Sequence, residues 1–312
     1  MKSRRIDSFL FSGNRLRFGW ILLILIAMII AGEVLLVDPL GRILNSVGIR
    51  EMSGDAPSIW AEFIHEFVKR GVRSLFVFFA VWFVLRTFHD QKTSDEMIHP
   101  GIKDSDDLIR GLGLGACIQV FSVLLMAMSG WYRIIDFAWQ TNGIDGVFRS
   151  SFHALMYSTE TGVIEETVFR WFLITTLYSR VGLSGAVVIS SALFGILHFS
   201  GFQTEFPWWA SIGSSTIAGL LFAQAYVIRY NVWLPIGIHA GWHAAARVLG
   251  SVGVSGNEAL FLITEVNGPT LLVNTRYGGA GGFEVAGVFL VSFFLWRFQN
   301  KKQIDPKNSL GM

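Results

Sequence analysis

The sequence is poor in charged residues and has almost no cysteine. Charged side chains make up 15% of its 312 residues, whereas an ordinary soluble domain carries about a quarter, so we exclude a soluble globular protein. Cys117 is its single cysteine, which excludes an internal disulfide and a structural zinc site built from cysteines. Basic and acidic residues nearly balance and no basic stripe occurs, so we expect no nucleic-acid partner.

Two common catalytic signatures are also missing from the sequence. No Gly-x-Ser-x-Gly segment occurs, which is typical of serine hydrolases. The His-Glu-x-x-His pattern of many zinc proteases is absent as well. Cys117 has no histidine near it in the sequence, so acyl transfer by serine or cysteine is the enzyme class that the sequence favours least.

Long apolar runs dominate what the sequence does contain. A run of about 18 or more nearly uncharged residues can cross the hydrocarbon layer as a helix. Continuous runs indicate helices, since barrel strands would alternate polar and apolar residues. The sequence therefore predicts an all-α membrane protein with about eight transmembrane helices. The expected spans are residues 20–37, 72–88, 108–128, 156–178, 183–199, 208–228, 232–249 and 282–296.

The flanking charges predict the orientation of these spans. The first apolar run follows a basic segment and continues to Val37, so we interpret it as a span and not as a cleavable signal. Lys and Arg are more frequent in the loops expected on the same side of the membrane as the N-terminus than in those on the opposite side. This excess predicts a multi-pass protein of the cell (inner) membrane with both termini cytoplasmic. Between the spans, residues 59–68 predict an amphipathic surface helix, and residues 250–282 a mobile, glycine-rich outer loop.

Ionisable residues inside apolar runs are the most informative positions, because each costs a few kcal/mol or more unless it is paired or wet. Glu165, Glu166 and Arg170 lie within the run 156–178. Glu166 and Arg170 are four residues apart, so they share a helix face and can hold helices together as an ion pair. No basic residue stands at that spacing from Glu165, so we expect Arg170 to pair with Glu166 alone and Glu165 to serve as an acid or base.

Three histidines lie in two other runs. His198 stands near one end of the run 183–199. His239, His243 and Arg247 follow one another at spacings of four, so they share one face of a helix that must look into the bundle. A single buried histidine is usually a packing residue, but three of them together with Glu165 form a set that supports chemistry.

Three functions remain open for this set. A carboxylate and a histidine can activate water against a peptide carbonyl while other imidazoles stabilise the oxyanion, without a metal. The same groups can instead ligate Zn²⁺, which acidifies the water. In a non-catalytic scaffold or a small transporter, the buried groups would relay protons or hold helices together.

Three motifs in order on separate spans give the sequence a family resemblance. They are Glu-Glu-x-x-x-Arg at 165–170, Phe-x-x-x-His at 194–198 and His-x-x-x-Asn at 239–243, where this sequence has His243 in place of Asn. Over roughly residues 155–250 the sequence resembles the CPBP family of membrane-embedded CAAX-processing and bacteriocin-processing endopeptidases. The resemblance implies a glutamic-type intramembrane protease with a catalytic cavity inside the helix bundle and no cofactor.

The resemblance also implies roles for the matching residues. Glu165 would activate water, His198 would help to hold that water, and Glu166 and Arg170 would support them. His239 and His243 would bind the developing oxyanion. A neutral histidine still donates one hydrogen bond, so His243 can replace the family's asparagine in principle. It also adds a ligand to the alternative zinc set, which is Glu165, His198, His239 and His243.

The sequence departs from the family's pattern at a second position. Trp171 stands where a glycine commonly follows the arginine. Residues 1–154 would form an N-terminal membrane region with a role in substrate selection, and 155–250 the catalytic core. Residues 251–312 would hold the outer loop, the last span and a basic cytoplasmic tail. The expected partners are the lipid bilayer and a membrane-anchored protein or peptide substrate.

Overall fold

A computed structural model describes most of the chain as helix. The residues it describes are 11–12, 15–16, 18–49, 58–88, 105–199, 206–251, 260–273 and 280–304. The contacts divide the chain into two compact units: the first holds residues 1–99 and 159–186, and the second holds residues 100–158 and 187–312. The all-α prediction is confirmed, with two short antiparallel strand pairs added.

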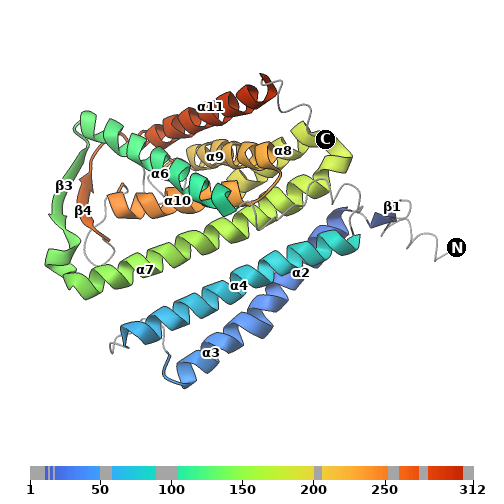
Figure 1. The fold of residues 1–312 in the computed structure, drawn as a ribbon, viewed down its shortest axis with the longest axis horizontal. Helices are drawn as coiled ribbons and strands as arrows, with labels where there is room; N and C mark the ends of the chain where they lie inside the picture. Colours follow the sequence, from blue (N-terminus) through green and yellow to red (C-terminus); the bar gives the residue numbers. More distant parts are fainter. Residues whose placement is uncertain are drawn as a thin grey trace. The chain divides into compact units, whose positions relative to one another are not determined.

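Helices α2 (Phe18–Gly32) and α4 (Ile59–Phe88) pack side by side in the first unit (Figure 1). Helix α2 passes through a π-helical turn, η1 (Glu33–Val37), into α3 (Asp38–Ser46). A short pair of strands, β1 (Phe11–Ser12) and β2 (Arg15–Leu16), precedes α2.

Helix α4 corrects the prediction of a separate surface helix over residues 59–68. That stretch is the beginning of α4, continuous with the predicted span 72–88. Its polar residues Glu62, His65 and Glu66 are buried. The amphipathic pattern therefore arises from a polar face that is covered by protein, not from a face that lies in water at the membrane surface.

Helix α7 (Ala138–Glu166) also starts earlier than predicted, since we expected a span only from residue 156. It continues through a second π-helical segment, η3 (Thr167–Ile174), into α8 (Thr175–Leu197). The backbone departs from helical geometry at Gly143 and Gly182, where φ is 67° and 72°. Glycine adopts this left-handed region without the penalty of a side chain, so both kinks fall on residues that permit them.

Helix α6 (Ser105–Met128) and helix α10 (Trp233–Leu249) approach each other most closely in the second unit. Glycines line the contact on both sides: Gly111 and Gly115 on α6, and Gly237 and Gly241 on α10. A Cβ on Gly115 would overlap the carbonyl oxygen of Ile238, and one on Gly241 would overlap that of Leu112. The two backbones therefore touch, as in helix pairs that associate through small residues in membranes.

A buried carboxylate ties three helix ends together in this unit. Asp107, in the first turn of α6, accepts two hydrogen bonds from Arg229, of 2.7 and 2.9 Å, at the end of α9 (Trp208–Arg229). It accepts a third, of 3.1 Å, from the Asn231 amide. The Asn231 side-chain oxygen in turn accepts from the Trp233 backbone N–H at the start of α10, so these contacts fix where α10 begins.

Strands β3 (Tyr132–Phe137) and β4 (Leu262–Val266) pair antiparallel (Figure 1), so part of the segment predicted as a mobile, glycine-rich outer loop is a strand. The Tyr132 hydroxyl donates a 2.5 Å hydrogen bond to the carbonyl oxygen of Leu249, the last residue of α10. Burial raises the pKa of the Tyr132 phenol, so it stays a donor at neutral pH. The strand pair therefore anchors the end of α10. The parts of the predicted loop at 252–259 and 274–279 lie outside the described residues.

Five helical stretches among the described residues are long and apolar enough to cross a membrane. They are Phe18–Ser46, Ile59–Phe88, Asp106–Met128, Ala138–Leu197 and Trp208–Arg229. Large apolar side chains on them, such as Leu35 and Leu75, are exposed, which suits contact with lipid. The chain is therefore an integral membrane protein. Helix α10, with 17 residues, and helix α11 (Gly282–Ile304) are further spans only by prediction, and the three-part division of the sequence also stays a prediction.

Candidate active site

Glu166 and Arg170 form the ion pair that their spacing predicts. Arg170 Nε lies 3.0 Å from Glu166 Oε2, and both side chains are fully buried. Arg170 also interacts electrostatically with Glu165, so the expectation that it serves Glu166 alone is wrong. Regular α-helical spacing places only Glu166 in line with Arg170, but the chain enters the π-helical η3 directly after Glu166. A π-helical turn brings residues five apart into line, which suits Glu165 and Arg170.

The neighbouring Trp171 has a packing role that explains its departure from the family pattern. It is buried in η3, and its ring centroid lies 4.7 Å from that of Phe78 on α4. A glycine at this position would leave this aromatic contact unmade. The contact fixes the segment that follows the two glutamates against α4.

His198 lies directly after the last turn of α8, and Phe194 holds it in two ways. The His198 ring stacks on the Phe194 ring at 4.2 Å and 29°. Its Nδ1 lies 2.7 Å from the Phe194 carbonyl oxygen. A carbonyl oxygen only accepts, so Nδ1 carries a proton, and in the neutral ring Nε2 is then the accepting nitrogen. The spacing of four residues in Phe-x-x-x-His thus sets both the position and the tautomer of the histidine.

His239 and His243 form a hydrogen-bonded pair on α10. Their Nε2 atoms are 3.1 Å apart, so one ring donates its N–H and the other accepts. His239 is almost fully buried. The Phe222 ring of α9 stacks on it at 4.7 Å and 6°, and the Phe194 ring meets it edge-on at 6.1 Å. Phe194 therefore contacts both His198 and His239.

Arg247 continues the polar face of α10. Its guanidinium lies 4.9 Å from the centre of the Tyr157 ring, which is a favourable cation–π distance. His243 lies within electrostatic range of His239, Arg247 and His198. The predicted grouping of the three histidines, with Arg247 beside them, is thus present in the second unit.

The structure therefore brings the predicted site residues together as two groups. Glu165, Glu166 and Arg170 belong to the first unit, and the three histidines belong to the second.

Sequence reasoning missed another buried carboxylate, Glu284, in the first turn of α11. Glu284 accepts from the Trp242 indole at 3.2 Å, from the Gly281 backbone N–H at 3.0 Å, and from the Gln119 amide. Glu284 lies within the predicted apolar span 282–296, and an ionisable residue in such a span is the feature that could have identified it.

The alternative zinc set can be tested in part on this geometry. Two imidazole nitrogens bound to one tetrahedral zinc lie about 3.3 Å apart, and the Nε2 atoms of His239 and His243 lie 3.1 Å apart. This pair fits a metal as well as a hydrogen bond. Among the described residues, no group of three or more His, Cys, Asp or Glu could hold a metal ion. The full set draws on both units, so zinc stays a prediction.

A comparison with protein families identifies this region. The family model of Rce1-like type II CAAX prenyl endopeptidases matches residues 148–245. These residues form an Rce1-like endopeptidase domain. The Rce1-like domain confirms the resemblance inferred from the three motifs, and it contains every predicted site residue. No curated protein and no solved structure matches the chain significantly. The chain therefore carries a peptidase domain of an integral membrane family.

Proposed function

We propose that the chain is an intramembrane endopeptidase that hydrolyses a peptide bond of a membrane-associated protein or peptide. The observation that carries this proposal lies within the Rce1-like domain: His198 and His239 both contact Phe194, and His243 is hydrogen-bonded to His239. The group offers an accepting nitrogen on His198 and a donor from the His239–His243 pair. These are the two functions that attack by water on a carbonyl requires.

The proposed reaction needs no metal. The Glu165 carboxylate removes a proton from a water molecule while His198 Nε2 accepts its other hydrogen bond. The water oxygen bonds to the scissile carbonyl carbon, and the His239–His243 pair donates its remaining N–H to the oxyanion that forms. The C–N bond then breaks and Glu165 returns the proton to the leaving amine. Glu166 and Arg170 hold the helix that carries Glu165.

His243→Asn is the variant that restores the family's residue, and we expect it to keep activity within about threefold of the wild type. An asparagine amide donates without depending on a tautomer. His243→Ala removes the donor, and loss of one oxyanion donor costs about 100-fold or more in kcat. Steady-state kinetics of both variants check this. If His243→Asn is as inactive as His243→Ala, the imidazole itself is required, as a zinc ligand would be.

The substrate and the setting follow the family description. A type II CAAX prenyl endopeptidase family implies membrane proteins as substrates, and a prenylated C-terminal CAAX sequence is the first to test. We propose a multi-pass protein of the cell (inner) membrane with eight spans and both termini cytoplasmic. Residues 1–154 would contribute to substrate selection.

The test uses the full chain reconstituted in liposomes with a farnesylated peptide that ends in a CAAX sequence. Mass spectrometry should detect release of the C-terminal tripeptide. We expect the rate to be unchanged after chelation and dialysis. Loss of cleavage on chelation, with recovery on adding stoichiometric zinc, would establish the zinc alternative with Glu165, His198, His239 and His243. Folded protein that hydrolyses neither this peptide nor membrane proteins would point to a scaffold or transporter.

A further inference from the structure

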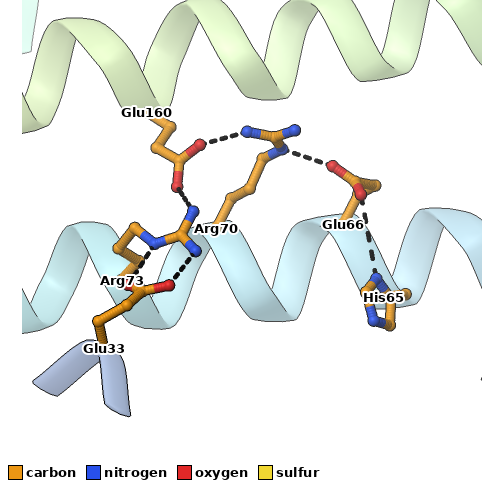
Figure 2. A network of polar contacts seen from close by, with 6 residues as sticks. All are labelled: Glu33, His65, Glu66, Arg70, Arg73 and Glu160. Carbon is orange, nitrogen blue, oxygen red and sulfur yellow. Dashed lines mark hydrogen bonds and ion pairs between the residues drawn. The ribbon is translucent and has the colours of Figure 1, made fainter. Parts of the chain in front are cut away.

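An ion-pair network outside the site crosses three helices of the first unit (Figure 2). The Arg73 guanidinium binds Glu33 through two hydrogen bonds, of 2.7 and 2.5 Å, and binds Glu160 Oε1 at 2.8 Å. Arg70 binds Glu160 Oε2 and, at 2.5 Å, Glu66. The network thus joins η1, α4 and α7, and Glu160 of α7 is held by two arginines of α4.

Glu160 is fixed more firmly than a single ion pair would fix it. Each of its two carboxylate oxygens accepts from a different arginine (Figure 2). Each arginine is held in turn by a second carboxylate, Glu66 for Arg70 and Glu33 for Arg73. A planar guanidinium that bridges two carboxylates has little freedom to rotate. The contacts therefore restrain α7 against both rotation about its axis and sliding along α4.

Glu160 lies on the same helix as the catalytic glutamates, five residues before Glu165 and about 7.5 Å along the axis. Beyond them, Trp171 packs on Phe78, again on α4. Helix α4 thus holds this segment at one point before the glutamates and at one point after them. Between the two points the chain changes from α to π geometry, which local hydrogen bonding favours weakly. The restraints from α4 therefore decide which way the two glutamates face.

We propose that Arg70, Arg73 and Glu160 are positioning residues for Glu165 and set the rotation of the helix segment that carries it. This inference rests on the proposed function, in which Glu165 activates water. Arg70 and Arg73 lie outside the matched family domain, so this part of the N-terminal region completes the peptidase domain. The position of the Glu165 carboxylate must be accurate, because a displacement of about 1 Å costs up to about 100-fold in rate.

The test compares Glu160→Gln with Glu33→Gln, assayed on the farnesylated peptide with the full chain in liposomes. Each variant removes one carboxylate that binds Arg73, but only Glu160 lies on the helix of Glu165. We expect Glu160→Gln to lower kcat about tenfold or more with KM within about twofold, and Glu33→Gln to change kcat by less than about threefold. Equal losses of kcat in the two folded variants would overturn the proposal, because only Glu160 lies on the helix of Glu165.

A second pair of variants covers the case in which Glu160→Gln does not fold. Phe78→Leu weakens the contact with Trp171, whereas Phe79→Leu changes a neighbouring exposed ring on α4. We expect kcat to fall several-fold in Phe78→Leu alone, and unchanged kcat in the folded variant would contradict the proposal. Glu165→Gln is assayed alongside. If it cleaves at the wild-type rate, the proposed function has failed; if it is inactive while Glu160→Gln and Phe78→Leu are normal, only the positioning role has failed.

Discussion

Glu165→Gln is expected to lower kcat for peptide hydrolysis by about 100-fold or more, the usual contribution of a general base. Glutamine has nearly the same shape as glutamate but cannot take the proton from water. Arg170 keeps its buried partner Glu166 in this variant, so the helix segment should stay intact. Steady-state kinetics of the purified, reconstituted protein measure the effect, with thermal unfolding as the check on folding.

Glu265→Gln is the matched control for this prediction. It makes the same chemical change at an exposed residue of strand β4, and we expect a rate within about twofold of the wild type, since surface substitutions change stability by less than about 0.5 kcal/mol. Wild-type activity in Glu165→Gln would remove the proposed base and leave the peptidase mechanism without a proton acceptor. Equal losses in both variants would show that the assay reports stability and not catalysis.

Gly115→Leu is expected to destabilise the protein by about 3 kcal/mol or more, the upper range for overpacking a tight contact. Any side chain at this position meets the backbone of α10 at Ile238 and Trp242, which cannot retreat as a flexible side chain can. Separation of α6 from α10 would also displace His239 and His243, so activity should be lost with stability. The midpoint of thermal unfolding in detergent measures the change.

Gly113→Leu provides the internal comparison on the same helix. A Cβ at Gly113 meets nothing within 4 Å. Leucine favours a helix over glycine by roughly 0.8–1 kcal/mol, so this variant should be as stable as the wild type or slightly more stable. Similar losses in the two variants would mean that the α6–α10 contact does not depend on glycine. A stable, active Gly115→Leu would contradict the packing of these helices.

Patterns within single apolar runs carried most of the successful predictions. Residue hydropathy alone distinguishes lipid-facing helices from soluble ones, which is why the membrane class and the all-α fold were predictable. The three motifs were recognisable because their spacings of four or five residues fall within one or two helical turns. The Glu166–Arg170 pair and the His239–His243 pair followed from the same regularity.

The features that the sequence did not reveal depend on non-local contacts or on departures from regular geometry. The interaction of Arg170 with Glu165 accompanies a π-helical segment, which no hydropathy pattern marks. The Glu33–Arg73–Glu160 network joins residues up to 127 positions apart. The polar residues at the start of α4 gave the amphipathic pattern that is typical of a surface helix. Strand β4 was hidden because it is short, lies within a glycine-rich segment and pairs with the distant strand β3.

Cleavage of membrane proteins with Glu165 as the base should produce new peptide termini that depend on this carboxylate. The most direct test compares new peptide termini in membrane fractions of cells that carry the wild type or Glu165→Gln at equal abundance. A specific set of termini should be present with the wild type and absent with the variant. Identical sets of termini, with both forms expressed and folded, would contradict it.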